Sequence, residues 1–168
     1  MENIKERTLS VLVDNSAGVL TRISGLFSRR GYNIKSLAVG ETEREGISRM
    51  TVIVSCNDRA LSQIVAQLQK QECVRRVRVL ENANQISREL LLIKVSTNAQ
   101  NRTQVIEIAN IFRARVIDAS PGSLTLELTG EADKSAALFE MLGEFGILES
   151  TRTGAVAVER GSGTIYDE

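Results

Sequence analysis

Apolar residues in the first half of the chain follow two spacings, one typical of strands and one typical of helices. Every second residue from Leu9 to Val13 is apolar, which predicts a strand that ends at Asp14. The spacing then becomes helical, with one apolar face, and predicts a helix from Gly18 to Arg30. The rest of this half is expected to contain strands over 32–39 and 47–55, a helix with its apolar face over 61–68, and a strand around 76–79. The predicted order is βαββαβ.

The second half repeats this order at a similar length. The expected elements are strands over 90–95, 115–119 and 124–129, helices opening at Asn101 and over 133–144, and a last strand over 147–158. Asn101 and Gln104 have the spacing of a capping box. A polar segment over 81–85 separates the halves and is the linker candidate.

These patterns predict an α+β protein of two ferredoxin-like βαββαβ domains in tandem, each an antiparallel sheet with helices on one face. The domains are expected to cover 7–81 and 86–160. Small domains of this type expose sheet edges, and we therefore expect a homodimer.

Composition excludes several classes of function. The 168 residues carry 21 Lys and Arg against 21 Asp and Glu, and only 4% are aromatic, so the charge and stacking surfaces of nucleic-acid binders are missing. The chain has no histidine, which excludes a Ser/His/Asp triad, a Cys/His dyad and imidazole metal ligands. The predicted strands 8–13 and 47–55 also lack the aromatic residues that an RNA-binding βαββαβ module needs.

The cysteines and the N-terminus point to a cytoplasmic protein. Cys56 and Cys73 do not form a CxxC motif, and we expect both to be buried and reduced. The N-terminal sequence MENIKERTLS is charged, and no apolar stretch is long enough for a membrane span.

The segment VDNSAGVL, between the first strand and the first helix, is the leading candidate for a binding site. A helix N-terminus presents unpaired N–H groups to a carboxylate or phosphate, and Gly18 leaves the backbone accessible there. Asn15 and Ser16 also have a purely structural explanation as helix caps. Asn33 is a second candidate, with a turn-supporting role as its alternative.

At these residues the sequence resembles a known family. The run LSVLVDNSAGVLTRISGLFSRRGYNIKSLAV, followed by SRMTVIV, closely resembles the N-terminal ACT domain of the small regulatory subunit of acetohydroxyacid synthase, also called acetolactate synthase. RELLLIKV and IFRARVIDASPGSLTLELTG resemble the C-terminal domain of the same subunit, so the likeness covers nearly the whole chain.

The resemblance implies a protein without an active site that binds and activates a catalytic subunit and makes it sensitive to valine. It places the effector between two ACT domains at a dimer interface, with motif positions at Asn15, Gly18 and Asn33. Backbone N–H groups, side-chain carbonyls and a small apolar wall can bind an amino acid. The expected effector-binding residues are Asn15, Ala17, Gly18, Val19, Leu20, Asn33 and Ile34.

By the same resemblance, this chain needs no cofactor, and thiamine diphosphate, Mg and FAD are expected on the catalytic subunit. No metal site, nucleic acid or membrane is expected as a partner. Two alternatives remain open: another amino-acid sensor built on an ACT domain, and a free-standing enzyme. The second is disfavoured because the sequence offers no histidine and no convergent pair of carboxylates.

Overall fold

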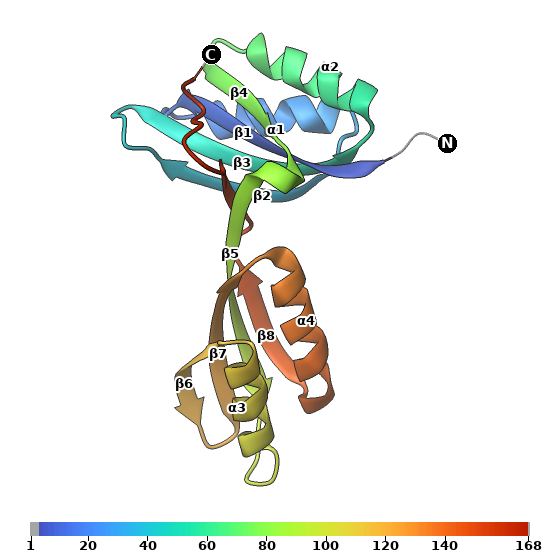
Figure 1. The fold of residues 1–168 in the computed structure, drawn as a ribbon, viewed down its shortest axis with the longest axis vertical. Helices are drawn as coiled ribbons and strands as arrows, with labels where there is room; N and C mark the ends of the chain where they lie inside the picture. The colour runs from blue at the N-terminus through green and yellow to red at the C-terminus, as the bar shows by residue number, and fades with distance from the viewer. Residues whose placement is uncertain (1–3, 168) are drawn as a thin grey trace. The chain divides into compact units, whose positions relative to one another are not determined.

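The computed structural model describes residues 4–167 and divides the chain into two compact units. One unit runs up to Ile86 and also includes the segment from Ala155 onward, while the other covers Ser87–Gly154 (Figure 1). Each unit has the predicted βαββαβ order, a four-strand antiparallel path and its own apolar core. The α+β fold class of two ferredoxin-like units is therefore confirmed.

The first unit orders its strands β2-β3-β1-β4, with every neighbouring pair antiparallel. Its elements are β1 (Lys5–Asp14), α1 (Val19–Arg29), β2 (Ile34–Glu41), β3 (Ile47–Cys56), α2 (Asp58–Gln69) and β4 (Val74–Leu80). Leu9, Val11 and Val13 of β1 pack in one cluster with the buried faces of both helices. The helices therefore cover a single face of the sheet, because alternate strand residues point to one side.

Local features of the first unit agree with the sequence. Asn57 caps α2, since its Oδ1 accepts a hydrogen bond from the Ala60 amide at 2.8 Å. Cys56 and Cys73 are buried and free, as expected. Burial raises the pKa of the Cys56 thiol above its ordinary value.

The second unit has the same strand order, β6-β7-β5-β8. Its elements are β5 (Gln85–Ser96), α3 (Arg102–Ile111), β6 (Arg115–Ser120), β7 (Ser123–Gly130), α4 (Ala132–Leu142) and β8 (Ile147–Arg152), with 3₁₀ turns at Asn82–Asn84 and Gly143–Phe145. The predicted capping box is wrong. Asn101 Oδ1 accepts from the Asn98 amide, and Asn98 Oδ1 in turn accepts from the amides of Gln100 and Asn101.

The strand predicted over 147–158 is interrupted. β8 ends at Arg152, and β9 (Val156–Glu159) begins after a break in which Gly154 has a φ of 79°. From Ala155 the chain groups with the first unit, whereas the predicted second domain extended to residue 160. Periodicity carried no sign of this change of unit, because a strand keeps the same alternation whichever sheet it packs on.

The segment 155–167 covers the face of the first sheet opposite the helices. Thr8, Ser10 and Leu12 of β1 point to that face and are nevertheless buried. The Ala155 amide donates to Ser36 Oγ at 2.9 Å, and Glu159 accepts from Arg78 at 2.6 Å. This C-terminal segment lies beside β4 in Figure 1. We call residues 155–167 the strap and the face they cover the strap face.

Candidate functional site

The turn between β1 and α1 is held by backbone hydrogen bonds to two other loops. The Asp14 amide donates to the Cys73 carbonyl at 2.9 Å, and the Asn15 amide donates to the Gly46 carbonyl at 2.8 Å. Gly18 then serves as the N-cap of α1 with a φ of 83°, a left-handed conformation that favours glycine. The sequence therefore uses Gly18 for backbone geometry as well as for access.

The side chains of Asn15 and Ser16 do not cap α1, so the structural alternative for them is wrong. Asn15 Nδ2 instead donates to Glu41 Oε1 at 2.9 Å, which ties the turn to the end of β2. Within residues 4–167, no side chain makes a cap hydrogen bond at the start of α1. The Val19 amide donates to the Ser16 carbonyl at 3.4 Å, and the N–H groups that follow it are available to an anion at the positive end of the helix dipole.

The aliphatic residues after Gly18 divide between core and surface. Val19 is buried in the core of the first unit, whereas Leu20 is 49% exposed and Ala17 is also exposed. One residue step rotates a helix by about 100°, so neighbours cannot share a face. Apolar surface at this turn comes from Leu20 rather than from Val19.

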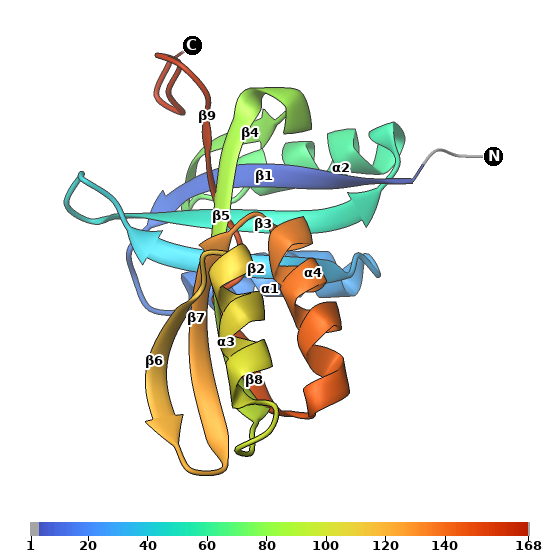
Figure 2. The same ribbon diagram turned by 60° about the horizontal axis from the view of Figure 1, so that its bottom comes forward.

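Asn33 and Ile34 lie at the other end of α1 from Gly18. Ile34 opens β2 opposite Val54, and Glu41 closes it opposite Ser48, so β2 runs in the same direction as β1 (Figure 2). The 11 residues of α1 separate the two groups by about 16 Å at 1.5 Å per residue. A single chain therefore does not bring all seven predicted residues to one place.

The two groups also differ in their surroundings. Asn33 is exposed, and Ile34 is partly buried against the core. The Gly18 group has carboxylates near it, since Glu41 accepts from Asn15, and Asp14 accepts from Arg75 Nε at 2.5 Å. Glu41 was missed by the sequence analysis, because its contact with Asn15 spans 26 residues and no local pattern relates the two.

The edges of the first sheet differ in character. β2 is an edge strand with Val39 49% exposed on it, and it carries a single cation, Lys35. The opposite edge, β4, carries three arginines, which discourage strand pairing. β2 is therefore the edge better suited to pair with another strand.

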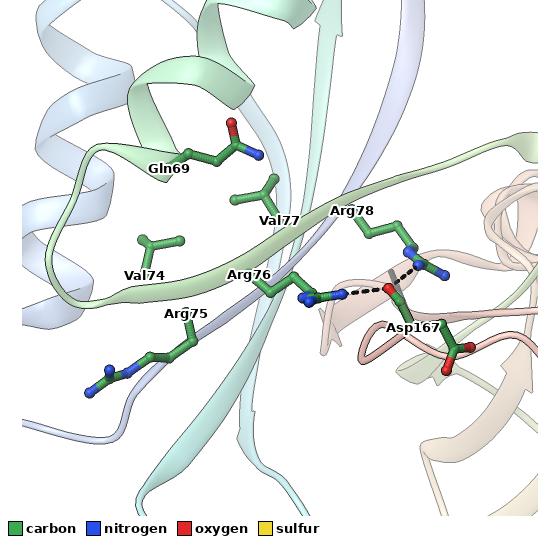
Figure 3. A pocket seen from close by; sticks show the side chains of 7 residues that line it. All are labelled: Gln69, Val74, Arg75, Arg76, Val77, Arg78 and Asp167. Carbon is green, nitrogen blue, oxygen red and sulfur yellow. Dashed lines mark hydrogen bonds between the residues drawn. The ribbon is translucent and has the colours of Figure 1, made fainter.

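A cavity of about 470 Å³ lies along β4, with Arg75, Arg76 and Arg78 in its lining. Arg76 and Arg78 donate to the Asp167 carbonyl, the latter at 2.9 Å, while Arg75 points away toward Asp14 (Figure 3). All three guanidinium groups already have partners, and those of Arg76 and Arg78 hold the strap in place.

The described residues offer neither a metal-binding cluster nor a membrane-spanning helix. Residues 4–167 contain no cluster of three or more His, Cys, Asp or Glu side chains placed to hold a metal ion. Within the same range, no helix combines the length and apolar character that crossing a membrane requires.

Comparison with protein families gives two matches that together span most of the chain. Residues 9–76 match the AHAS small subunit-like ACT domain, and residues 88–161 match the small subunit of acetolactate synthase. These matches fall on the first and second βαββαβ units in turn.

Individual proteins give the same result. The chain is 52% identical to the acetolactate synthase small subunit of Mycolicibacterium smegmatis, over 92% of this chain and 91% of that protein. It is 48% identical to the probable acetolactate synthase small subunit of Methanothermobacter thermautotrophicus, over 94% of both. The crystal structure of the Thermotoga maritima small subunit superposes with a TM-score of 0.89 at 35% identity, covering 95% of this chain and all of that one.

Sequence, fold and comparisons agree over both units, and the chain belongs to the family of acetolactate synthase small subunits.

Proposed function

We propose that this protein is a regulatory subunit that activates a catalytic acetolactate synthase subunit and makes it sensitive to feedback inhibition by valine. The observation that carries the proposal is the start of α1, where Gly18 exposes helix N–H groups that no side chain caps within the described residues. An amino-acid carboxylate fits this position, because the helix dipole and the free N–H groups both favour an anion.

The separation of Gly18 from Asn33 supports an effector site shared by two chains. When two β2 edges pair antiparallel about a twofold axis, the Gly18 end of one chain lies beside the Asn33 end of the other. Each dimer then has two equivalent pockets, each built from both chains. A homodimer through the first unit is part of this proposal.

In such a pocket the groups divide their roles by chemistry. The α1 N–H groups bind the carboxylate, and Asn33 Oδ1 of the partner subunit accepts from the ammonium group. Leu20 supplies exposed apolar surface for a short branched side chain, and Ile34 contributes part of its surface. A monoamino, monocarboxylic amino acid of valine size matches this set of groups.

The chemistry of synthesis is assigned to the partner. We place thiamine diphosphate, Mg and FAD on the catalytic subunit and no cofactor on this chain. The complex is expected to act in the cytoplasm.

The direct test mixes the purified chain with the catalytic subunit from the same organism and measures acetolactate formation. The chain alone is expected to form none, and its addition should raise turnover and confer inhibition by valine. Leucine and isoleucine, tested in parallel, compare the effectors. If turnover and inhibition are unchanged by the addition, the regulatory role is wrong. Calorimetric binding of an unrelated amino acid in place of these three would favour another amino-acid sensor.

A further inference from the structure

A second cavity lies between the strap and the strap face of the first sheet, away from the start of α1. Its volume is about 360 Å³, which is within the range of small-molecule sites. β1, β3 and β4 supply one wall, and residues from Val158 to Tyr166 supply the other. All of these residues belong to the same compact unit. The β1–α1 turn contributes nothing to its lining.

Ser10 gives this cavity an unsatisfied polar group. Ser10 is only 1% exposed, and its Oγ has no hydrogen-bond partner within residues 4–167. A buried hydroxyl without a partner destabilises a folded protein, so such groups are rare in native structures. Ser10 lines the cavity, where its hydroxyl can donate a hydrogen bond to a ligand oxygen.

Arg49 gives the same cavity an unpaired cation. It lies on β3, is partly buried, and forms no hydrogen bond or salt bridge within residues 4–167, although its charge acts on the exposed Glu43 carboxylate across the cavity. Arg78, also in the lining, is instead paired with Glu159 at 2.6 Å and donates to the Asp167 carbonyl. The lining carboxylate that remains is Glu43, which is exposed and therefore screened by solvent. Arg49 is thus the lining cation that no salt bridge neutralises, and the exposed Glu43 is the carboxylate whose charge it meets.

Part of the wall is apolar, beside the polar Thr164 and Tyr166. Leu80 of β4 and Ile165 of the strap are both buried and line the cavity together with Val158. The strap also folds closely on itself here, since a Cβ added at Gly163 would lie 3.0 Å from the Glu159 carboxyl carbon. These side chains offer a small apolar surface to a short hydrocarbon chain.

We propose that this cavity binds a small organic monocarboxylate with a short branched aliphatic chain. Arg49 and the Ser10 hydroxyl hold the carboxylate, and Leu80 and Ile165 contact the hydrocarbon chain. A monoanion matches the one free cation, whereas a doubly charged phosphate would face Glu43 and Glu159 without enough positive charge to balance it. This cavity is separate from the proposed effector site, and its occupancy can be tested independently of the proposed regulatory role.

The first test titrates the full chain with isobutyrate and follows amide shifts by ¹H–¹⁵N NMR. Two controls separate the contributions of charge and shape. Isobutyramide has the shape of isobutyrate without its negative charge, and chloride at matched ionic strength has a negative charge without the hydrocarbon chain. We expect isobutyrate alone to shift the amides of Gly161 and Gly163 saturably. Equal shifts with isobutyramide or with chloride would overturn the proposal, as would no shift at all.

The second test uses Ser10→Ala and Arg49→Gln, with Arg22→Gln on the exposed surface of α1 as the control. Each cavity variant should weaken isobutyrate binding about tenfold or more, because each removes a hydrogen bond to a charged group. Ser10→Ala should also raise Tm without ligand, since it removes an unsatisfied buried hydroxyl. A lower Tm of Ser10→Ala would mean that the hydroxyl already has a partner in the protein, which contradicts the proposal. Unchanged isobutyrate affinity in both variants would show that isobutyrate does not bind in this cavity. Asn33→Ala should bind isobutyrate as the unmodified chain does, whatever its response to valine.

Discussion

Gly18 and Asn33 lie at opposite ends of α1, although the sequence places both among the effector-binding candidates. Gly18 begins the helix where β1 ends, and Asn33 follows the helix where β2 begins. Because β1 and β2 run in the same direction, the chain cannot close this distance by itself. The effector-site predictions below follow from this separation.

Gly18→Asp should abolish valine inhibition of the complex, with Gly18→Asn as its matched control. A Cβ at residue 18 meets nothing within 4 Å, so both variants pay only the left-handed φ of 83°, about 1–2 kcal/mol. The aspartate adds a like charge near the effector carboxylate, worth about 4 kcal/mol at 4 Å and an effective dielectric of 20. The valine concentration for half-inhibition should rise about a thousandfold in Gly18→Asp relative to Gly18→Asn. Equal inhibition of the two variants would place the ligand elsewhere.

Asn33→Ala should weaken valine inhibition less, by about 1.5–3 kcal/mol, because it removes one hydrogen bond to a charged group. Activation of the catalytic subunit should be retained, since Asn33 is exposed and its loss leaves no buried group unpaired. Inhibition curves for this variant and for the unmodified chain give the comparison.

Mixed dimers of Gly18→Asp and Asn33→Ala chains should recover valine binding at one site per dimer. If each pocket takes Gly18 from one chain and Asn33 from the other, one pocket in the mixed dimer carries both changes and the second carries neither. Calorimetry on tagged, purified mixed dimers should therefore find one site of unmodified affinity. Finding no such site would mean that each pocket lies within one chain.

Val39→Asp on the β2 edge should convert the dimer into monomers. The residue is 49% exposed, so the single chain should fold normally, while antiparallel pairing of two β2 edges would bury a carboxylate from each chain. A loss of about 3 kcal/mol corresponds to more than a hundredfold in the dimer dissociation constant. Sedimentation equilibrium measures it, with Ile111→Asp, at a residue 75% exposed in the second unit, as the control. A dimer unaffected by Val39→Asp would exclude this edge.

Ile165→Ala should lower the free energy of unfolding by about 2 kcal/mol or more, because its side chain is buried between the strap and the first sheet. Val156→Ala in the same segment should change it by less than about 0.5 kcal/mol, since Val156 is exposed. Urea unfolding followed by circular dichroism compares the two. Equal effects would show that the strap does not hold this face.

The sequence by itself determined the elements and the family. Alternation in β1 and β3 and the helical spacing of α1 and α2 follow from which residues must face a core, and this information is local. Asn57 was predictable as a cap because a cap needs only its own helix. The start of α1 was predicted as a candidate site for the same reason, since Gly18 and the first helix N–H groups are neighbours in the chain.

Tertiary structure alone decided the contacts between distant segments. Asn15 bonds to Glu41 rather than to its own helix because the fold brings the end of β2 beside the turn. Ser10 is a polar residue at a position where alternation predicts exposure to solvent. It is buried because the strap, from the far end of the sequence, covers this face of the sheet. The register of β1, β3 and β2 likewise sets Gly18 and Asn33 apart. Strand pairing and chain return join residues that no local periodicity relates, and for that reason a pattern along the sequence cannot reveal them.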